Sequence, residues 1–179
     1  GIPEQEYISH LLADLRQDLG YVQGREISSI FIGGQYNTVT GGAGIALGSS
    51  NTVSNAYSMA LGSLNNITAS RAATLGTGLQ ANAYGEVVLG KYNELIGASP
   101  SADVATDPIL EVGIGTSTTP LNAMTILKNG RVGIGTTAPK AHFELSSNGH
   151  EYLRVTSTIS DDAGIDLVRI PGGDWRIAN

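Results

Sequence analysis

The chain lacks cysteine and has few large aromatic residues, with only 2 Phe and 1 Trp among 179 residues. Without cysteine, neither a disulfide framework nor a thiolate metal site can form. Against 24 glycines, so few bulky side chains are a poor basis for one large globular core. We therefore expect a repetitive, glycine-punctuated β-rich architecture.

Charge is also scarce, because charged residues make up 15% of the chain and the formal net charge is −6. A nucleic-acid partner requires clustered Lys and Arg, whereas the 10 basic residues here are scattered along the sequence. No run of about 18 apolar residues occurs, so we expect no membrane insertion in this segment. The chain opens at Gly-Ile-Pro without a signal-peptide pattern, and we expect it to be a piece of a longer protein.

A period of 14 residues organises the chain from about residue 28 to 98. Successive units include "IALGSSNTVSNAYS", "MALGSLNNITASRA" and "VVLGKYNELIGASP". Glycine and asparagine recur at fixed places in these units, where we expect turns: Gly34, Gly48, Gly62, Gly76 and Gly90, and Asn37, Asn51, Asn65 and Asn93. Leu79 replaces the asparagine in one unit.

Each unit contains the elements of one coil. Apolar residues two apart, such as Ile45 and Leu47, have the period of a strand with one buried face. The following glycine supplies a turn with positive φ, and asparagine also tolerates that region. A second short strand then turns Val53 inward. Such units predict a parallel β-roll that rises about 4.8 Å per coil.

The predicted core of the repeat is aliphatic and consists of Leu47, Val53, Leu61, Ile67, Leu75, Leu89 and Leu95. A coil this thin buries little apolar surface for the chain that it orders. We expect identical rods to associate along a second face, where small residues such as Ala46, Ala60 and Thr74 permit close approach. The sequence thus predicts an obligate oligomer.

The repeats at 28–98 resemble the head of trimeric autotransporter adhesins. That resemblance implies a left-handed parallel β-roll in a homotrimer. Downstream, "NGRVGIGTTAP" within 99–139 resembles a connector of phage tail fibres, and 140–179 resembles the knob-like modules that follow it there. Together, the residue patterns and the resemblance predict an all-β fold with a short N-terminal helix, in which the homotrimeric parallel β-roll is followed by small interwoven β-modules, the last of them truncated.

The flanking segments carry their own patterns. In 1–24, apolar residues at alternating steps of 4 and 3 predict an amphipathic helix, packed on its own domain or forming a short trimeric coiled coil. The seam residues are Ile8, Leu12, Leu15, Leu19 and Val22. Further on, Asn129-Gly130 predicts a tight turn between two strands, and residues 97–110 a loop.

We expect no catalytic residues and no cofactor. The three histidines, His10, His142 and His150, have no metal-ligand spacing between them. Asp161 and Asp162 could belong to a calcium cluster, but a solvated acidic loop explains them as well. A glycan-cleaving enzyme would need paired carboxylates, and Glu86 and Glu94 are the only acidic residues of the roll.

Four tyrosines are candidates for surface binding: Tyr36, Tyr57, Tyr84 and Tyr92. Amphipathic rings suit contacts with sugars or proteins, although the same rings pack equally well against their own chain.

The sequence therefore predicts an extracellular, structural and adhesive fibre segment. We expect it in a phage tail fibre or tail-like injection appendage, where it positions or mediates recognition of a host-cell glycan or protein and contacts neighbouring fibre or baseplate proteins. The alternative is a head fragment of a cell-anchored trimeric autotransporter adhesin on a bacterial surface.

Overall fold

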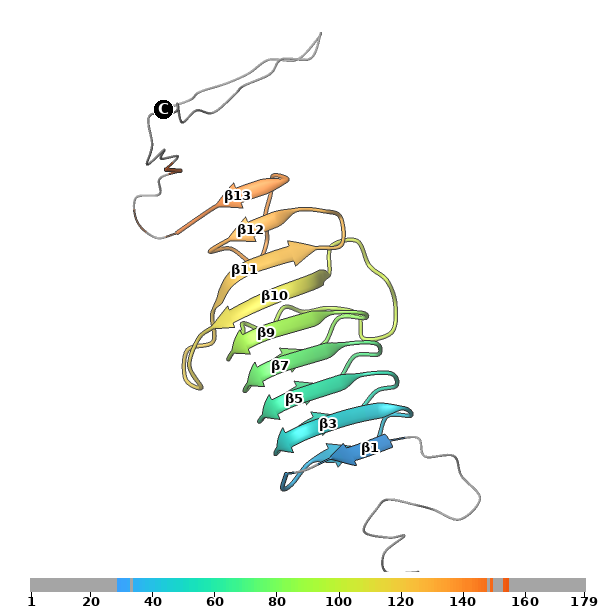
Figure 1. Ribbon diagram of the computed structural model, residues 1–179. Helices are drawn as coiled ribbons and strands as arrows, with labels where there is room; N and C mark the ends of the chain where they lie inside the picture. The colour runs from blue at the N-terminus through green and yellow to red at the C-terminus, as the bar shows by residue number, and fades with distance from the viewer. Residues whose placement is uncertain (1–28, 33, 148, 150–152, 155–179) are drawn as a thin grey trace, which may run out of the picture. The chain divides into compact units, whose positions relative to one another are not determined.

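The computed structural model describes residues 29–32, 34–147, 149 and 153–154, and every regular element in this part is a β-strand (Figure 1). The chain divides into two units, Gly1–Ser147 and Asn148–Asn179, and the fold below is that of the first. The predicted helix at 1–24 with its seam, Asp161, Asp162 and most of the C-terminal module lie outside the described residues.

Two sheets build the first unit. The long sheet has nine strands in the order β1-β3-β5-β7-β9-β10-β11-β12-β13, and the short sheet has four in the order β2-β4-β6-β8. The long sheet comprises β1 (Ser29–Ile32), β3 (Gly44–Ser49), β5 (Met59–Ser63), β7 (Ala73–Thr77), β9 (Val87–Lys91), β10 (Pro108–Ile114), β11 (Asn122–Leu127), β12 (Val132–Ile134) and β13 (Phe143–Leu145). The short sheet comprises β2 (Thr38–Val39), β4 (Thr52–Val53), β6 (Asn66–Ile67) and β8 (Gln80–Ala81).

The strands pair in the predicted 14-residue register. Leu47 lies opposite Leu61 and Leu61 opposite Leu75 in the long sheet, and Val53 lies opposite Ile67 in the short one, all in parallel. Each of the first four coils thus contributes one strand to each sheet, and the coil that begins with β9 contributes to the long sheet alone. The predicted all-β fold, with mostly parallel strands in a solenoid of 14-residue coils, is confirmed.

Glycine is required at one corner of every coil. Gly62 has a φ of +117°, and a Cβ placed on it would lie 1.9 Å from the carbonyl oxygen of Gly76 in the next coil. No side chain fits there. The asparagines were predicted to share this positive-φ role, which is wrong: the residue before each of them has the positive φ, as Ser50 and Leu64 show at 56° and 58°.

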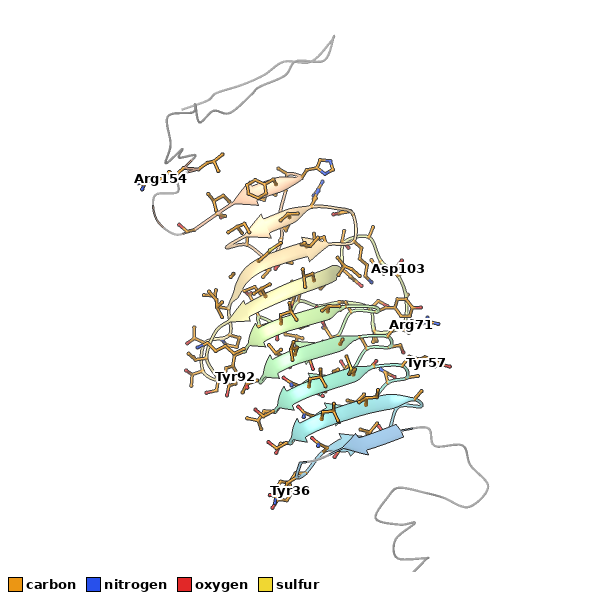
Figure 2. The ribbon with its side chains drawn as sticks, in the orientation of Figure 1. Tyr36, Tyr57, Arg71, Tyr92, Asp103 and Arg154 are labelled. Atoms are coloured by element: carbon orange, nitrogen blue, oxygen red, sulfur yellow. The ribbon has the colours of Figure 1, made fainter. Side chains whose placement is uncertain are left out.

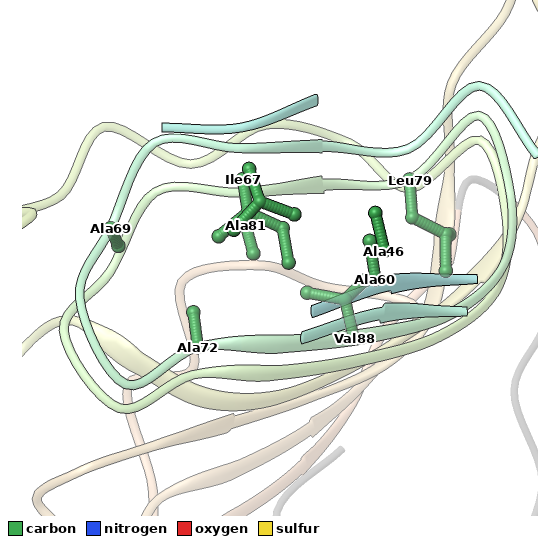
Figure 3. Packing of buried hydrophobic residues seen from close by; sticks show 9 residues of the cluster. Ala46, Ala60, Ile67, Ala69, Ala72, Leu79, Ala81 and Val88 are labelled. Atoms are coloured by element: carbon green, nitrogen blue, oxygen red, sulfur yellow. The ribbon is translucent and has the colours of Figure 1, made fainter. Parts of the chain in front are cut away.

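The core between the two sheets is made of small and β-branched side chains together with Leu79 (Figure 3). Val53 and Ile67 of the short sheet are fully buried, as predicted. Opposite them, the long sheet contributes Ala46 and Ala60, which are also fully buried.

The prediction for the leucines of the long sheet is corrected. Leu75 is 54% exposed, and Leu47, Leu61 and Leu89 are partly exposed. Leu95, which follows β9 and lies in neither sheet, is 49% exposed as well. Ala46, Ala60 and Thr74, which were expected to face a neighbouring rod, fill the interior instead. A 14-residue coil holds its sheets so close together that only small side chains fit opposite valine and isoleucine at protein packing density.

The sheet continues past the last coil of the repeat. Strand β10 pairs with β9 in parallel, and then β11 and β12 each run antiparallel to the preceding strand. The Asn129-Gly130 turn between β11 and β12 is confirmed, with Gly130 at a φ of +82°. Residues 97–107 of the predicted loop lie between β9 and β10, whereas 108–110 already belong to β10. The Ser99 and Pro100 carbonyls of the loop accept N–H groups from Tyr84 and Ser70 of the coils.

Candidate functional site

The outer side of the long sheet carries two adjacent columns of apolar side chains. Paired residues on neighbouring strands share a face of the sheet, and the registers connect apolar residues from β3 to β13. We call this surface the apolar face: Ile45, Leu47, Met59, Leu61, Ala73, Leu75, Val87, Leu89, Leu110, Val112, Met124, Ile126, Val132, Ile134, Phe143 and Leu145. None of these side chains is buried, and Phe143 is 60% exposed.

The apolar face is unusual for a chain that stands alone in water. Soluble monomers rarely expose contiguous apolar patches larger than a few hundred Å², and larger ones mark interaction sites. The other side of the same strands faces the core, so the described part of the chain covers only one side of the long sheet. The apolar face can therefore gain stability by contact with another apolar surface.

Inside the roll, asparagine side chains connect one coil to the next. Asn65 donates from Nδ2 to the carbonyls of Leu61 and Gly76, both at 3.1 Å, and its Oδ1 accepts the Leu79 N–H at 3.0 Å. Asn51 makes the same kinds of contact one coil earlier and accepts the Asn65 N–H at 3.1 Å. The repeated asparagines thus form a ladder along the roll, although turn chemistry alone was enough to explain their spacing in the sequence.

The ladder has one gap. Leu79 occupies the position of an asparagine and is fully buried in the core. Asn93 resumes the pattern with different partners, because its Oδ1 accepts the Gln80 N–H at 2.8 Å and its Nδ2 donates to Glu111. Glu111 of β10 thereby connects the repeat to the strands that follow it.

Two glutamates are buried where the repeat meets β10. Glu86 is 0% and Glu111 is 1% exposed. Oε2 of Glu86 accepts the N–H groups of Asn82 and Ala83, each at 2.9 Å. Within the described residues, Oε1 of each glutamate has no hydrogen-bond partner, and the nearby Lys128 Nζ forms an ion pair with Asp103. Sequence reasoning did not single out this pair, because nothing in the period places Glu111 beside the last coil.

Burial changes the chemistry of these carboxyl groups. Burial, followed by the charge of Glu111, raises the pKa of Glu86 to about 8. Burial also raises the pKa of Glu111 to about 7, against the opposing effect of the hydrogen bond from Asn93. The pair holds protons near neutral pH, and its enclosure leaves no surface for contact with a substrate in solution.

The four candidate tyrosines lie on two edges of the roll. Tyr36 and Tyr92 lie on one edge and Tyr57 on the opposite edge (Figure 2). Tyr36 and Tyr57 are 82% and 68% exposed, whereas Tyr84 and Tyr92 are partly buried. The ring of Tyr92 lies over Gly78, where an added Cβ would be 2.3 Å from Tyr92 Cε1. Tyr92 is therefore packed against its own chain.

Tyr57 and Tyr84 lie beside cations that the sequence analysis did not single out. The guanidinium carbon of Arg71 is 5.7 Å from the Tyr57 ring centroid and 5.2 Å from that of Tyr84. Lys128 Nζ lies 5.7 Å from the Tyr84 centroid and 3.1 Å from Oδ1 of Asp103. Tyr57 and Arg71 are 14 residues apart, and this spacing was the available signal that they stack.

Within the described part of the chain, no three or more His, Asp or Glu side chains gather in a way that could hold a metal ion. His142 is exposed. The same residues include no helix with the length and apolar character of a membrane span.

Comparison with known proteins leaves the family open. No family model and no solved structure matches the chain. A 33-residue segment, 18% of the chain, is 67% identical to the heme chaperone HemW of Buchnera aphidicola subsp. Schizaphis graminum. A segment of the same length is 54% identical to the heme chaperone HemW of Escherichia coli. The match spans 9% of the length of each of these relatives.

Proposed function

We propose that this chain is a shaft segment of an extracellular, homotrimeric adhesive fibre. The apolar face is the observation that carries this proposal. It extends over eight hydrogen-bonded strands, from β3 to β13, which suits lengthwise contact between identical parallel rods better than a small local interface. Three copies around one axis would bury all three apolar faces against one another.

The number of copies and the kind of fibre come from the sequence resemblance. The repeats resemble the heads of trimeric autotransporter adhesins, and the connector resembles those of phage tail fibres. The sheet that runs on from the repeat into the connector supports a rigid shaft. We therefore place the segment in a tail fibre or tail-like injection appendage, where it positions or mediates recognition of a host surface.

A second location is favoured by the repeat alone, namely the head of a cell-anchored trimeric adhesin. Both locations predict a protein outside the cell, but they differ in the particle that carries it. Immunogold labelling with an antibody against residues 34–147 distinguishes them. Label on the fibres of phage or injection particles supports our proposal, whereas label on the surface of producing cells supports the alternative. Label confined to the cell interior would contradict both.

A further inference from the structure

We infer that the edge formed by Tyr57, Arg71 and Tyr84 binds the carboxylate of an acidic sugar on the target surface. We call these three residues the cationic edge. This inference deepens the proposed adhesive function and rests on it, because it names the class of ligand and the residues that contact it.

Stacking of coils builds the cationic edge. Tyr57 lies one coil before Arg71 and Tyr84 lies in the coil after it, so the guanidinium lies between coils that each present a ring at 5.7 Å or less. Tyr57 and Arg71 are both exposed, and Figure 2 shows them together on one edge of the roll. A ring and a cation are thus presented to solvent side by side.

Arg71 has no acidic partner in the described part of the chain, where the ion pair that forms is between Lys128 and Asp103. Its backbone N–H donates to the Ala56 carbonyl at 3.0 Å, but no hydrogen bond from its guanidinium is found among these residues. A guanidinium presents five donors in a planar fork that matches a carboxylate with two parallel hydrogen bonds. The stacked rings hold the fork in place while its N–H donors stay available for a ligand.

The backbone at the cationic edge has a strained, left-handed conformation. Tyr57 and Arg71 have φ values of 59° and 58°, and the equivalent residue of the next coil is Gly85, with a φ of 71°. Glycine adopts this conformation without strain, whereas bulky residues do so at a cost. The same conformation recurs at Ala43 of this corner and at Ser50 and Leu64 of the other corner, so it belongs to the turn of the coil. Here it places a phenol ring and a guanidinium at the corner.

An acidic sugar fits this edge better than other anions. The exposed ring of Tyr57 offers an apolar surface with a polar tip, which suits the C–H face and hydroxyl groups of a sugar. The fork of Arg71 suits its carboxylate. Nucleic acid is disfavoured by the net charge of −6. An acidic peptide would pair with the Arg71 guanidinium but contact the Tyr57 ring less well. Such a peptide is the competing ligand in the test.

The test is calorimetric titration of the assembled protein with two acidic probes, sialyllactose and oligogalacturonate. Lactose and maltotriose serve as neutral controls. We expect binding of at least one acidic probe, with its neutral control weaker by about tenfold or more, the loss expected for a missing charge-assisted pair. Arg71→Gly should abolish this binding without lowering the melting temperature, since glycine suits the backbone. Arg71→Lys should weaken binding because the fork is lost.

Tyr57→Ala should also weaken binding, whereas Tyr36→Ala, on the opposite edge, should leave it unchanged. The inference is overturned if neither acidic probe binds, if the neutral controls bind equally well, if Arg71→Gly binds like the parent protein, or if a polyglutamate peptide binds more tightly than both sugars. It is also overturned if Arg71→Gly changes the mass of the particle, because the edge would then be a contact between copies. Loss of the assembly in the parent protein would instead contradict the proposed function.

Discussion

At the scale of single residues, the roll depends on contacts that each coil makes with the next through glycine and asparagine. The glycine at each corner allows the backbone of one coil to lie against the carbonyl of the next. The asparagine ladder satisfies backbone groups that would otherwise be buried without partners, and each unsatisfied group costs about 1–3 kcal/mol. Such a thin core leaves stability dependent on these polar contacts.

Gly62→Ala tests the close approach of adjacent coils. The added methyl group would lie 1.9 Å from the Gly76 carbonyl oxygen at a φ of +117°. Backbone strain and steric overlap together should lower the free energy of unfolding by about 2–6 kcal/mol. Thermal denaturation at one fixed protein concentration measures this loss. Gly42→Ala is the matched control, because a Cβ there meets nothing within 4 Å, and equal losses from both variants would refute the explanation.

The buried glutamates make stability depend on pH. Both folded-state pKa values, about 8 for Glu86 and about 7 for Glu111, lie above the ordinary glutamate pKa of 4.5. Below pH 4.5 the carboxyl groups are protonated in both states. As the pH rises towards 8, the unfolded chain loses these protons more readily than the folded chain, so the folded state loses stability.

Glu86→Gln removes the larger of these two effects. A neutral amide tolerates burial without releasing a proton, so we expect a higher melting temperature at pH 8 and little change at pH 4.5. The increase in the free energy of unfolding at pH 8 is limited to several kcal/mol, since each pKa unit corresponds to about 1.4 kcal/mol. Melting curves from pH 4 to 9 measure it, with the less buried Glu144→Gln as the control. A stabilisation independent of pH would show that ionisation of Glu86 is not its cause.

At the scale of elements, the sequence period predicts where strands and turns occur but not which side of a strand faces inward. In β3, β5 and β7, side chains point alternately to the two sides of the sheet. One side carries mostly small residues and the other carries larger apolar residues. The usual rule places the larger apolar set inside. Here the room between two close sheets decides instead, so Ala46 and Ala60 are buried and Leu75 is exposed.

The two candidate sites also differ in whether the sequence period predicts their contacts. Tyr57 and Arg71 could be predicted to stack, because residues one period apart lie in neighbouring coils. The buried pair could not, because Glu111 follows a loop without periodicity and reaches Asn93 only through the pairing of β10 with β9. Contacts between coils of the repeat can thus be predicted from the 14-residue spacing. Contacts between the last coil and the strands that follow it cannot.

Leu75→Lys tests whether the apolar face is the contact between copies. Leu75 lies in the middle of the repeat and is 54% exposed, so a lysine there changes the chain's own core little but places a charge in the proposed interface. We expect the assembly to weaken by at least about tenfold in sedimentation equilibrium, given the cost of an unpaired charge at an apolar contact. Asn66→Lys, exposed on β6 of the short sheet, adds the same charge elsewhere. The proposed interface would be wrong if both variants assembled like the parent protein.

At the scale of the whole molecule, the uncovered side of the long sheet is the feature on which the proposed association rests. The described chain is a solenoid whose long sheet is covered on one side only. We propose that two further copies cover the other side, which makes the fibre a product of association as much as of folding. An assembly of this kind should have no stable folded monomer, so its melting temperature should rise with protein concentration.

The most direct test of this central claim is the mass of the parent protein in solution, measured by light scattering over a dilution series. We predict a particle of three chains, about three times 18.5 kDa, that persists on dilution until the protein unfolds. A stable, well-folded monomer would contradict the shared fibre axis and leave the apolar face without its proposed partner.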